Sequence, residues 1–256
     1  MGLIKSPSQI GKMAESGRIV SKTMREVSAS IVPGKTTLLD LDNLAHRIIT
    51  SEGGVPSFLG YRNFPNSACI SVNDRVVHGI PTPYILKPGD IVSLDFGVQK
   101  DNFHADSAWT FGVGTIDPAA QRLLNVTREA LYQGIAQAKI GRTIGDIASA
   151  IQRYCERAGY GVVRDLVGHG IGESLHEEPH NVPNFGKPGR GIKLAEGMCL
   201  CIEPMINQGT ARVKTLDDGW TVVTADGKLS AHFEHTVAIT RDGPLILTQE
   251  RPTRLN

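Results

Sequence analysis

Apolar residues recur at helical spacing in two stretches near the start of the chain. Over residues 8–31 they occupy positions 10, 13, 20, 24, 27 and 31, and over residues 39–51 they occupy positions 41, 44, 48 and 49. Recurrence at three- and four-residue intervals is typical of the buried face of an amphipathic helix. Pro33-Gly34 and Gly53-Gly54 follow the two stretches, and such pairs favour turns. The sequence therefore predicts two consecutive helices.

Strand-like apolar runs follow as far as about residue 113, and two further helix signals come after them. Asp117-Pro118 places an acid at an N-cap and a proline in the first turn, which predicts a third helix to about Lys139. Thr143 and Asp146 have the spacing of a capping box, which predicts a fourth helix that ends at Gly159. Strands are predicted for most of the remaining chain.

The order of two helices followed by strands thus occurs twice, and short segments repeat in the same order. His78-Gly79-Ile80 matches His169-Gly170-Ile171, GDIVSLD matches GMCLCIE, and FHADSAWTF matches AHFEHTVAI. Repetition of this kind indicates a duplicated supersecondary unit. We expect an α+β fold in a single domain, residues 1–256, with pseudo-symmetric halves at about 8–115 and 116–245. Each half would pair two helices with an antiparallel sheet, and strands of both halves would face one central site.

Composition narrows the functional classes. The chain has 256 residues, 40% of them hydrophobic, and 27 basic against 26 acidic residues, so it lacks the basic excess of a nucleic-acid binder. No apolar run is long enough to cross a membrane, and the N-terminal segment lacks the apolar region of a signal peptide. The four cysteines are too few for a disulfide framework in a chain of this length, and Cys199 and Cys201 are interpreted as reduced core thiols. We therefore expect a cytoplasmic protein.

Acidic residues lie in or at the end of apolar strands, where a core is expected. Glu203 ends one such run, Asp95 ends another, and Glu234 lies inside a third. A lone buried carboxylate is costly unless it has a partner. Each acid alone could pair with an Arg or Lys or lie at a wet strand end. With Asp106, however, they form four acids at symmetry-matched positions, and no basic residue occupies a comparable position in these strands, which favours a pair of divalent cations.

The set of candidate ligands indicates the class of metal. The four carboxylates supply oxygen and His169 supplies nitrogen. Such a site suits manganese, iron or cobalt and tolerates zinc. Two adjacent divalent ions are a known hydrolytic arrangement that activates one bridging water.

His176-Glu177-Glu178-Pro179-His180 matches the H-E-x-x-H signature of zinc proteases, which requires one continuous helix. Pro179 disfavours helix both at its own position and at the residue before it. We therefore interpret His176 as a loop residue aimed at the central site. For His176 and for His78, a surface-loop histidine remains the alternative.

The motifs together resemble the type I methionine aminopeptidases, which have the pita-bread fold. The matching segments are GYRNFPNSACISVNDRVVHGIP, GDIVSLDFGVQKDNFHADSAWTF, GHGIGESLHEEPH, CIEPM and DGWTVVTADGKLSAHFEHT, spread over residues 60–240. The resemblance implies a hydrolase that removes the initiator methionine from nascent proteins when the second residue is small. Two divalent ions, of cobalt, manganese, iron or zinc, would activate a water that attacks the first peptide bond.

The resemblance also implies the role of each site residue. Asp106 and Glu234 would bridge both ions, Asp95 would bind one, and His169 and Glu203 would bind the other. Glu203 would also act as general base and acid. His176 would support the developing oxyanion, and His78 would contact the amide beyond the scissile bond.

An apolar pocket for the methionine side chain is implied as well. By resemblance it is formed by Tyr61, Phe64, Cys69, Leu175 and Trp220. Leu175 stands where the family often has an aromatic residue, and Phe58 stands where a smaller residue is common. Asn73 and Ser230 resemble a site for one monovalent cation.

The partners implied are the N-termini of nascent polypeptides, with ribosome association as a further expectation. Neither a membrane nor a specific nucleic acid is expected, and the chain is expected to be a monomer. A prolidase or Xaa-Pro aminopeptidase on the same fold is one alternative, disfavoured because those enzymes usually carry a further N-terminal domain. A non-catalytic protein of this fold that binds a partner or RNA is another, disfavoured because all five ligands are present.

Overall fold

The structure, a computed structural model, describes residues 4–249, so the ends of the predicted domain at residues 1 and 256 lie outside the described part. The helices are α1 (Pro7–Ala29), α2 (Leu38–Ser51), α3 (Pro118–Ile135) and α4 (Ile144–Arg157), with a short 3₁₀ helix η1 (Tyr61–Asn63). The strands are β1 (Val55–Pro56), β2 (Cys69–Val72), β3 (Arg75–Val77), β4 (Ile91–Lys100), β5 (Phe103–Gly112), β6 (Gly161–Val162), β7 (Gly168–Gly170), β8 (Glu177–Val182), β9 (Cys199–Ile202), β10 (Met205–Asn207), β11 (Val213–Thr215), β12 (Val222–Thr224), β13 (Ser230–His232), β14 (His235–Thr240) and β15 (Gly243–Ile246).

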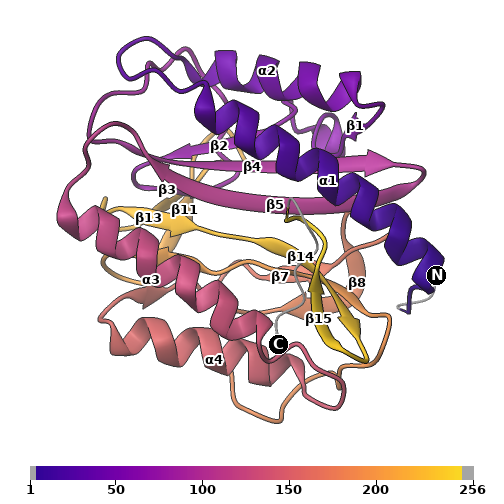
Figure 1. Cartoon of the computed structure of the whole chain (residues 1–256). Helices are drawn as coiled ribbons and strands as arrows, with labels where there is room; N and C mark the ends of the chain where they lie inside the picture. The colour runs from indigo at the N-terminus through magenta and orange to yellow at the C-terminus, as the bar shows by residue number, and fades with distance from the viewer. Residues whose placement is uncertain (1–3, 250–256) are drawn as a thin grey trace.

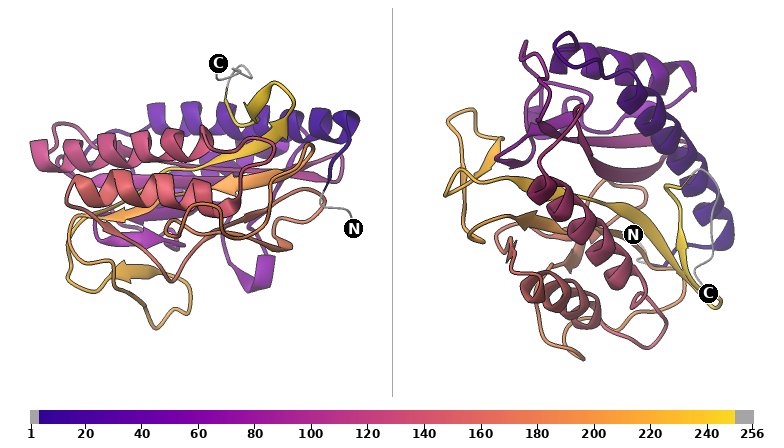
Figure 2. Two further views of the ribbon diagram at one scale, coloured as in Figure 1. Left: turned by 90° about the horizontal axis from the view of Figure 1, so that it is seen from below. Right: turned by 60° about the vertical axis from the view of Figure 1, so that its left-hand side comes forward.

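Two helix pairs and two main sheets form the predicted pair of halves (Figure 1). The first half has the sheet β1-β4-β2 with β5 paired to β4, and the second has the sheet β15-β14-β9-β7-β8. Two smaller sheets, β13-β10-β6 and β11-β12-β3, complete the strands. The ladders between these strands are antiparallel, and the helices gather on one side of them (Figure 2). The expected α+β architecture is confirmed.

The helix boundaries follow local sequence signals. The Ser6 hydroxyl and the Gln9 side chain form a capping box at the start of α1, and Thr143 and Asp146 form the predicted one at α4. The predicted third helix is too long, because α3 ends at Ile135 rather than near Lys139. Residues 136–137 instead form a turn and residues 138–139 are irregular, with Ala138 fully buried in the core.

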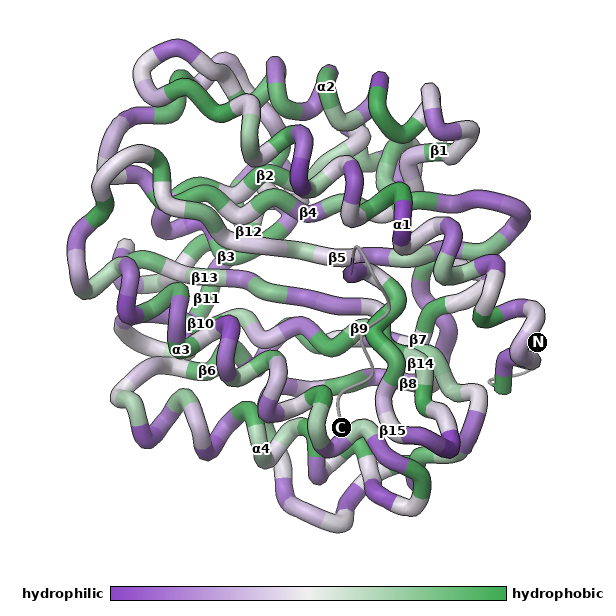
Figure 3. Tube along the Cα trace, in the orientation of Figure 1, coloured by the Kyte–Doolittle hydropathy of each residue, from purple (hydrophilic) through white to green (hydrophobic). Residues whose placement is uncertain are grey.

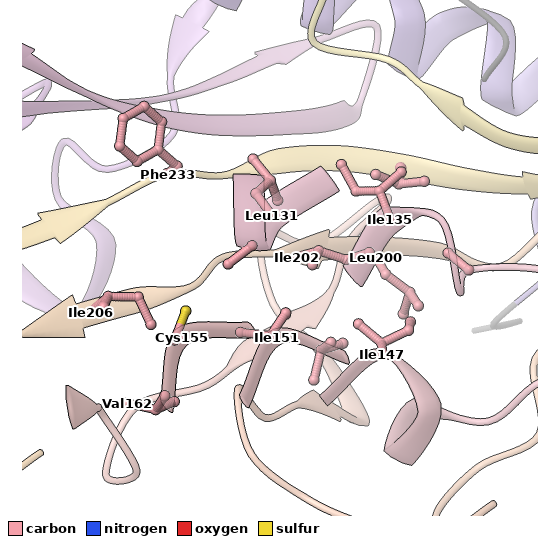
Figure 4. Packing of buried hydrophobic residues seen from close by; sticks show 14 of the residues in the cluster. Leu131, Ile135, Ile147, Ile151, Cys155, Val162, Leu200, Ile202, Ile206 and Phe233 are labelled. Carbon is pink, nitrogen blue, oxygen red and sulfur yellow. The ribbon is translucent and has the colours of Figure 1, made fainter. Parts of the chain in front are cut away.

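Each half has its own apolar core. The second is built where α3 and α4 pack over β9, with Leu131, Ile135, Ile147 and Ile151 close to Leu200 (Figure 4). The first lies between α1, α2 and the strands β2 and β4. Hydrophilic residues concentrate in outer turns such as the β4–β5 connection (Figure 3). Within residues 4–249 no helix is long and apolar enough to cross a membrane.

The two halves are joined along β5 and the start of β14. The Thr236 hydroxyl accepts a hydrogen bond from the Asp106 amide at 2.9 Å and donates one to the Asp106 carbonyl at 2.8 Å. The Glu234 amide donates to the Ala108 carbonyl at 2.7 Å, and the Ser107 hydroxyl donates to the Glu234 carbonyl at 2.6 Å. These bonds hold Asp106 of one half beside Glu234 of the other.

Candidate metal centre and substrate cavity

Four carboxylates converge at the junction of the two halves. Asp95 lies in β4 and Asp106 in β5, where Asp95 faces Ala108 across the ladder. Glu203 directly follows β9, and Glu234 directly precedes β14, whose first residue faces the last residue of β9. Asp95, Asp106 and Glu234 are at most 8% exposed. The duplicated strand pattern therefore brings one pair of acids from each half to one place.

These carboxylates lack the partners that buried charges need. One oxygen each of Asp95, Asp106 and Glu234 is buried without a hydrogen-bond partner. Burial, followed by the charges of Asp106 and Glu203, raises the pKa of Asp95 well above its ordinary value. Burial raises the pKa of Asp106 to about 7 and that of Glu203 to about 7, and burial together with the other three acids raises that of Glu234. A cation among them would remove this penalty.

His169 is oriented to act as a ligand. Its Nδ1 lies 3.0 Å from the carbonyl oxygen of Gly170, an acceptor that requires the proton to be on Nδ1. The unprotonated Nε2 then faces the acids, 3.8 Å from Glu203 Oε1 and 4.0 Å from Asp106 Oδ2. Burial lowers the pKa of His169, which keeps the ring neutral and able to bind a metal.

Two further residues lie at this centre that the sequence reasoning did not include. The Cys201 thiol, interpreted as a core thiol, lies with Asp106, His169 and Glu234 in a group whose possible ligand atoms are all within 4.8 Å of one another. Burial and the adjacent acids raise its pKa, so it remains a thiol. His232 Nε2 lies 3.3 Å from Glu203 Oε2. Strand alternation is the sequence signal that points to both residues. Cys201 precedes Glu203 by two residues, and His232 precedes Glu234 by two residues.

The donor set fits divalent cations. It offers four carboxylates and one neutral imidazole, and three carboxylate oxygens have no other partner. Oxygen-rich donors of this kind suit manganese, iron or cobalt. The chain therefore contains a buried group of Asp, His, Cys and Glu that could bind metal.

A cavity of about 180 Å³ opens onto the carboxylates, and all twelve residues predicted for the site line it. They are Tyr61, Phe64, Cys69, His78, Asp95, Asp106, His169, Leu175, His176, Glu203, Trp220 and Glu234. Phe58, named as unusual, lines it too, and so does Arg62, which no sequence signal singled out. Arg62 and Asn63 have φ of 47° and 69°, so a tight left-handed turn presents Arg62 at this cavity.

One wall of the cavity is apolar. Phe64 and Trp220 meet edge to face with ring centroids 5.1 Å apart, and Cys69 and Leu175 are 5% and 3% exposed. Phe58 belongs to the same buried cluster, and Tyr61 and Trp220 pack against it. A wall of aromatic rings and one sulfur suits an unbranched thioether side chain.

His78 and His176 reach the centre from opposite halves. His78 has φ of 56°, and Gly79 after it is required because an added Cβ would lie 2.3 Å from the Ile70 carbonyl oxygen. The centroid of the His176 ring lies 4.0 Å from that of the His169 ring. The His176 ring also stacks on Tyr61, with the two ring centroids 5.2 Å apart. Burial lowers the pKa of His78 to about 4. Desolvation, then the neighbouring His169, lowers that of His176 as well, although solvent reaches this ring and moderates the effect.

The H-E-x-x-H segment is not helical. Residues 177–182 form strand β8, and His176 precedes it in the loop after β7. The prediction from Pro179 is confirmed. The two histidines therefore do not share the helix face that a zinc protease of that class requires.

The predicted monovalent-cation residues also lie together. The Ser230 amide donates to the Asn73 carbonyl at 2.9 Å, and the Ser230 hydroxyl donates to Asn207 Oδ1 at 2.8 Å. The Asn73 side chain is engaged by Asp90 and by the Ile91 amide. The side chains of Asn73 and Ser230 are thus both engaged in hydrogen bonds to neighbouring residues.

Known proteins share this sequence and this fold. The model of metallopeptidase family M24 matches residues 11–241. A methionine aminopeptidase of Clostridium perfringens is 53% identical over 248 residues, which cover 97% of this chain and 99% of that protein. The solved structure of a methionine aminopeptidase from Thermotoga maritima has a TM-score of 0.94 at 45% identity and covers 96% of this chain and 99% of that one. A prolidase from Pyrococcus furiosus has a TM-score of 0.78 at 22% identity, which shows the fold alone, and only 66% of it is covered.

Proposed function

The chain belongs to metallopeptidase family M24 and, within it, to the methionine aminopeptidases of the pita-bread fold, and from this premise we propose how its site works. The enzyme removes the N-terminal methionine from proteins. The proposals below concern its metals, the role of each residue and its preference among substrates. The observation that carries them is the group of four carboxylates that line the cavity, three of which have a buried oxygen without a hydrogen-bond partner.

We propose that the centre binds two divalent ions, and that Asp106 and Glu234 would each contribute ligands to both. Asp95 would bind one ion, and His169 and Glu203 would bind the other. When bound, such ions polarise a carbonyl and lower the pKa of water. Four negative charges match two divalent cations, which supports this stoichiometry. Cobalt, manganese, iron and zinc are the candidates for this donor set.

Glu203 would take up and return the proton of the reaction. Its carboxylate lies within the group of acids, with Oε1 3.8 Å from His169 Nε2, so it would offer a proton acceptor directly at the reacting centre. His232 Nε2 lies 3.3 Å from the second carboxylate oxygen and would restrict its orientation. Neutral His176 would donate a hydrogen bond to the developing oxyanion, and neutral His78 would contact the amide beyond the scissile bond.

The apolar wall would hold the methionine side chain, with the α-amino group directed towards the acids. The cavity is only about 180 Å³, enough for one long side chain. His78 and His176 would crowd the position beyond the scissile bond, so that a small second residue is preferred. A bulky second residue would displace the scissile carbonyl, and a displacement of about 1 Å can reduce the rate on the order of 10²-fold.

A peptide comparison tests this function against the prolidase alternative. Each candidate metal is added to the purified enzyme with Met-Ala-Ser, Met-Lys-Ser or Ala-Pro-Ala. We expect rapid release of methionine from Met-Ala-Ser, slow release from Met-Lys-Ser and no cleavage of Ala-Pro-Ala. Preferential cleavage of Ala-Pro-Ala would contradict the assignment.

We also propose that the enzyme acts in the cytoplasm, as a monomer, on chains emerging from the ribosome, and that a monovalent cation binds near Asn73 and Ser230. The Ser230–Asn73 hydrogen bond supports the last proposal, because it holds the two residues together. Sedimentation of the purified enzyme, alone and with ribosomes, tests the oligomeric state and the association.

A further inference from the structure

A buried ion pair lies outside the catalytic centre, next to the loop that carries His176. Lys5 Nζ lies 2.6 Å from Glu177 Oε2, and the two side chains are 3% and 13% exposed. Surface pairs in this chain differ: the side chains of Arg241 and Glu196 are 83% and 49% exposed. An exposed ion pair contributes little to stability, whereas loss of one partner of a buried pair leaves a buried charge uncompensated. A substitution in the Lys5–Glu177 pair should therefore have the larger effect.

Glu177 ties this pair to the loop between β7 and β8. Its other carboxylate oxygen, Oε1, accepts a hydrogen bond from the Glu173 amide at 3.0 Å. One carboxylate therefore spans the loop from residue 173 to residue 177 while it also binds Lys5. Between these anchors lie Leu175, on the apolar wall of the cavity, and His176, beside His169.

Lys5 also packs directly on this loop. A Cβ added to Gly172 would lie 2.1 Å from Lys5 Cε and 2.5 Å from Glu177 Oε1, so glycine permits the close approach. The Lys5 amide donates to the Gly197 carbonyl at 2.8 Å, just before β9, which leads to Glu203. The backbone of Lys5 is thus fixed to the sheet while its ammonium group holds the loop.

We propose that Lys5 is a positioning residue, which through Glu177 holds the loop of residues 171–176 so that His176 lies over the metal centre. The inference rests on the proposed function of His176. Lys5 itself touches neither the cavity nor the acids; it acts on the reaction through the placement of that imidazole. Lys5→Met keeps most of the unbranched side chain and removes the charge, and Arg241→Met removes the charge at the exposed pair.

The expected result is a local loss of catalysis. Lys5→Met should lower kcat/KM for Met-Ala-Ser by about 10–100-fold, mainly in kcat, because misplacement of a catalytic group by about 1 Å has effects of this size. Metal content should stay at the wild-type value, and hydrogen exchange should accelerate in residues 171–176. Arg241→Met should retain wild-type activity. Ile151→Val, a small truncation in the distant α3–α4 core, should lower the melting temperature without this kinetic change.

A double-mutant cycle decides whether Lys5 acts through His176. Lys5→Met is combined with His176→Ala, and kcat is measured for all four proteins. We expect Lys5→Met to change kcat less than threefold once His176 is absent. An equal loss in both backgrounds, or wild-type activity of Lys5→Met itself, would overturn the inference. If Lys5→Met does not fold, Glu177→Gln replaces it, because the amide leaves one of the two donors without an acceptor.

The same assay separates this inference from the function on which it rests. Absence of methionine release by the wild-type enzyme would remove the proposed function. Release by the wild-type enzyme with an unchanged Lys5→Met variant would remove only the role of Lys5.

Discussion

Substitution of Asp106 by Asn should inactivate the enzyme and yet stabilise the metal-free protein. Asp106 is 4% exposed, its Oδ1 has no hydrogen-bond partner, and burial followed by the charge of Glu203 raises its pKa to about 7. Asparagine has the same shape and carries no charge. Removal of the ionisable group therefore removes an unfavourable term that only bound metal offsets.

The size of this effect depends on pH. A carboxyl group whose pKa is raised by folding opposes folding above its ordinary pKa, and the loss grows until the pH passes the folded-state pKa. With a pKa of about 7 in place of 3.8, the penalty at pH 7.5 is on the order of 4 kcal/mol, and at pH 5 it is below about 2 kcal/mol. For a chain of this size, about 4 kcal/mol corresponds to roughly 10 °C in melting temperature.

The assay is thermal unfolding of chelator-treated protein at pH 5 and pH 7.5. Metal-free Asp106→Asn should melt well above the metal-free wild type at pH 7.5, and the difference should shrink at pH 5. With metal added, the wild type should gain stability and the variant should gain much less. Asp42→Asn is the matched control: Asp42 is also buried but accepts hydrogen bonds from Asn66, Ser67 and Ala68, so its variant should be less stable at both pH values. A metal-free Asp106→Asn protein that is less stable than the wild type at pH 7.5 would show that the charge of Asp106 does not destabilise the metal-free fold.

Three further predictions follow from the site. His176→Ala should reduce kcat by roughly 10²–10³-fold with metal retained, as for loss of an oxyanion donor, and metal content as low as in Asp106→Asn would show that the roles are wrongly divided. In a Met-X-Ser panel, small second residues should be cleaved fast and Lys, Arg or Phe slowly; equal rates for Met-Ala-Ser and Met-Arg-Ser would refute the crowding by His78 and His176. Trp220→Ala should raise KM for Met-Ala-Ser about 10-fold or more, since it opens the apolar wall, and an unchanged KM would place the methionine side chain elsewhere.

Much of this centre could be predicted because its residues lie in duplicated, strongly patterned strands. Strand alternation and the repeat place Asp95, Asp106, Glu203 and Glu234 at equivalent positions, and the helix-breaking Pro179 correctly excludes a helical zinc motif. Cys201 lies on the same strand face as Glu203 by this alternation. In the sequence, however, a cysteine in an apolar run cannot be distinguished from a core residue until the facing strand is known.

Contacts between distant segments could not be predicted from the sequence. Nothing near Lys5 in the chain indicates that it is buried against Glu177, which lies 172 residues away. Arg62 reaches the cavity because its backbone is left-handed. A left-handed backbone is typical of glycine, so an arginine at this position does not predict it. The α3 helix ends at Ile135, and Ala138 after it is buried in the core through contacts that the local sequence does not specify.

Metal dependence with a counted stoichiometry is the most direct test of a dinuclear centre. The enzyme is stripped with a chelator, and release of methionine from Met-Ala-Ser is measured while manganese or cobalt is added in steps and bound metal is counted. The four carboxylates and His169 predict no activity in the stripped protein, and activity that returns as the bound metal approaches two ions per chain. Full activity after exhaustive chelation, with no metal bound, would show that the enzyme does not need metal ions for this reaction.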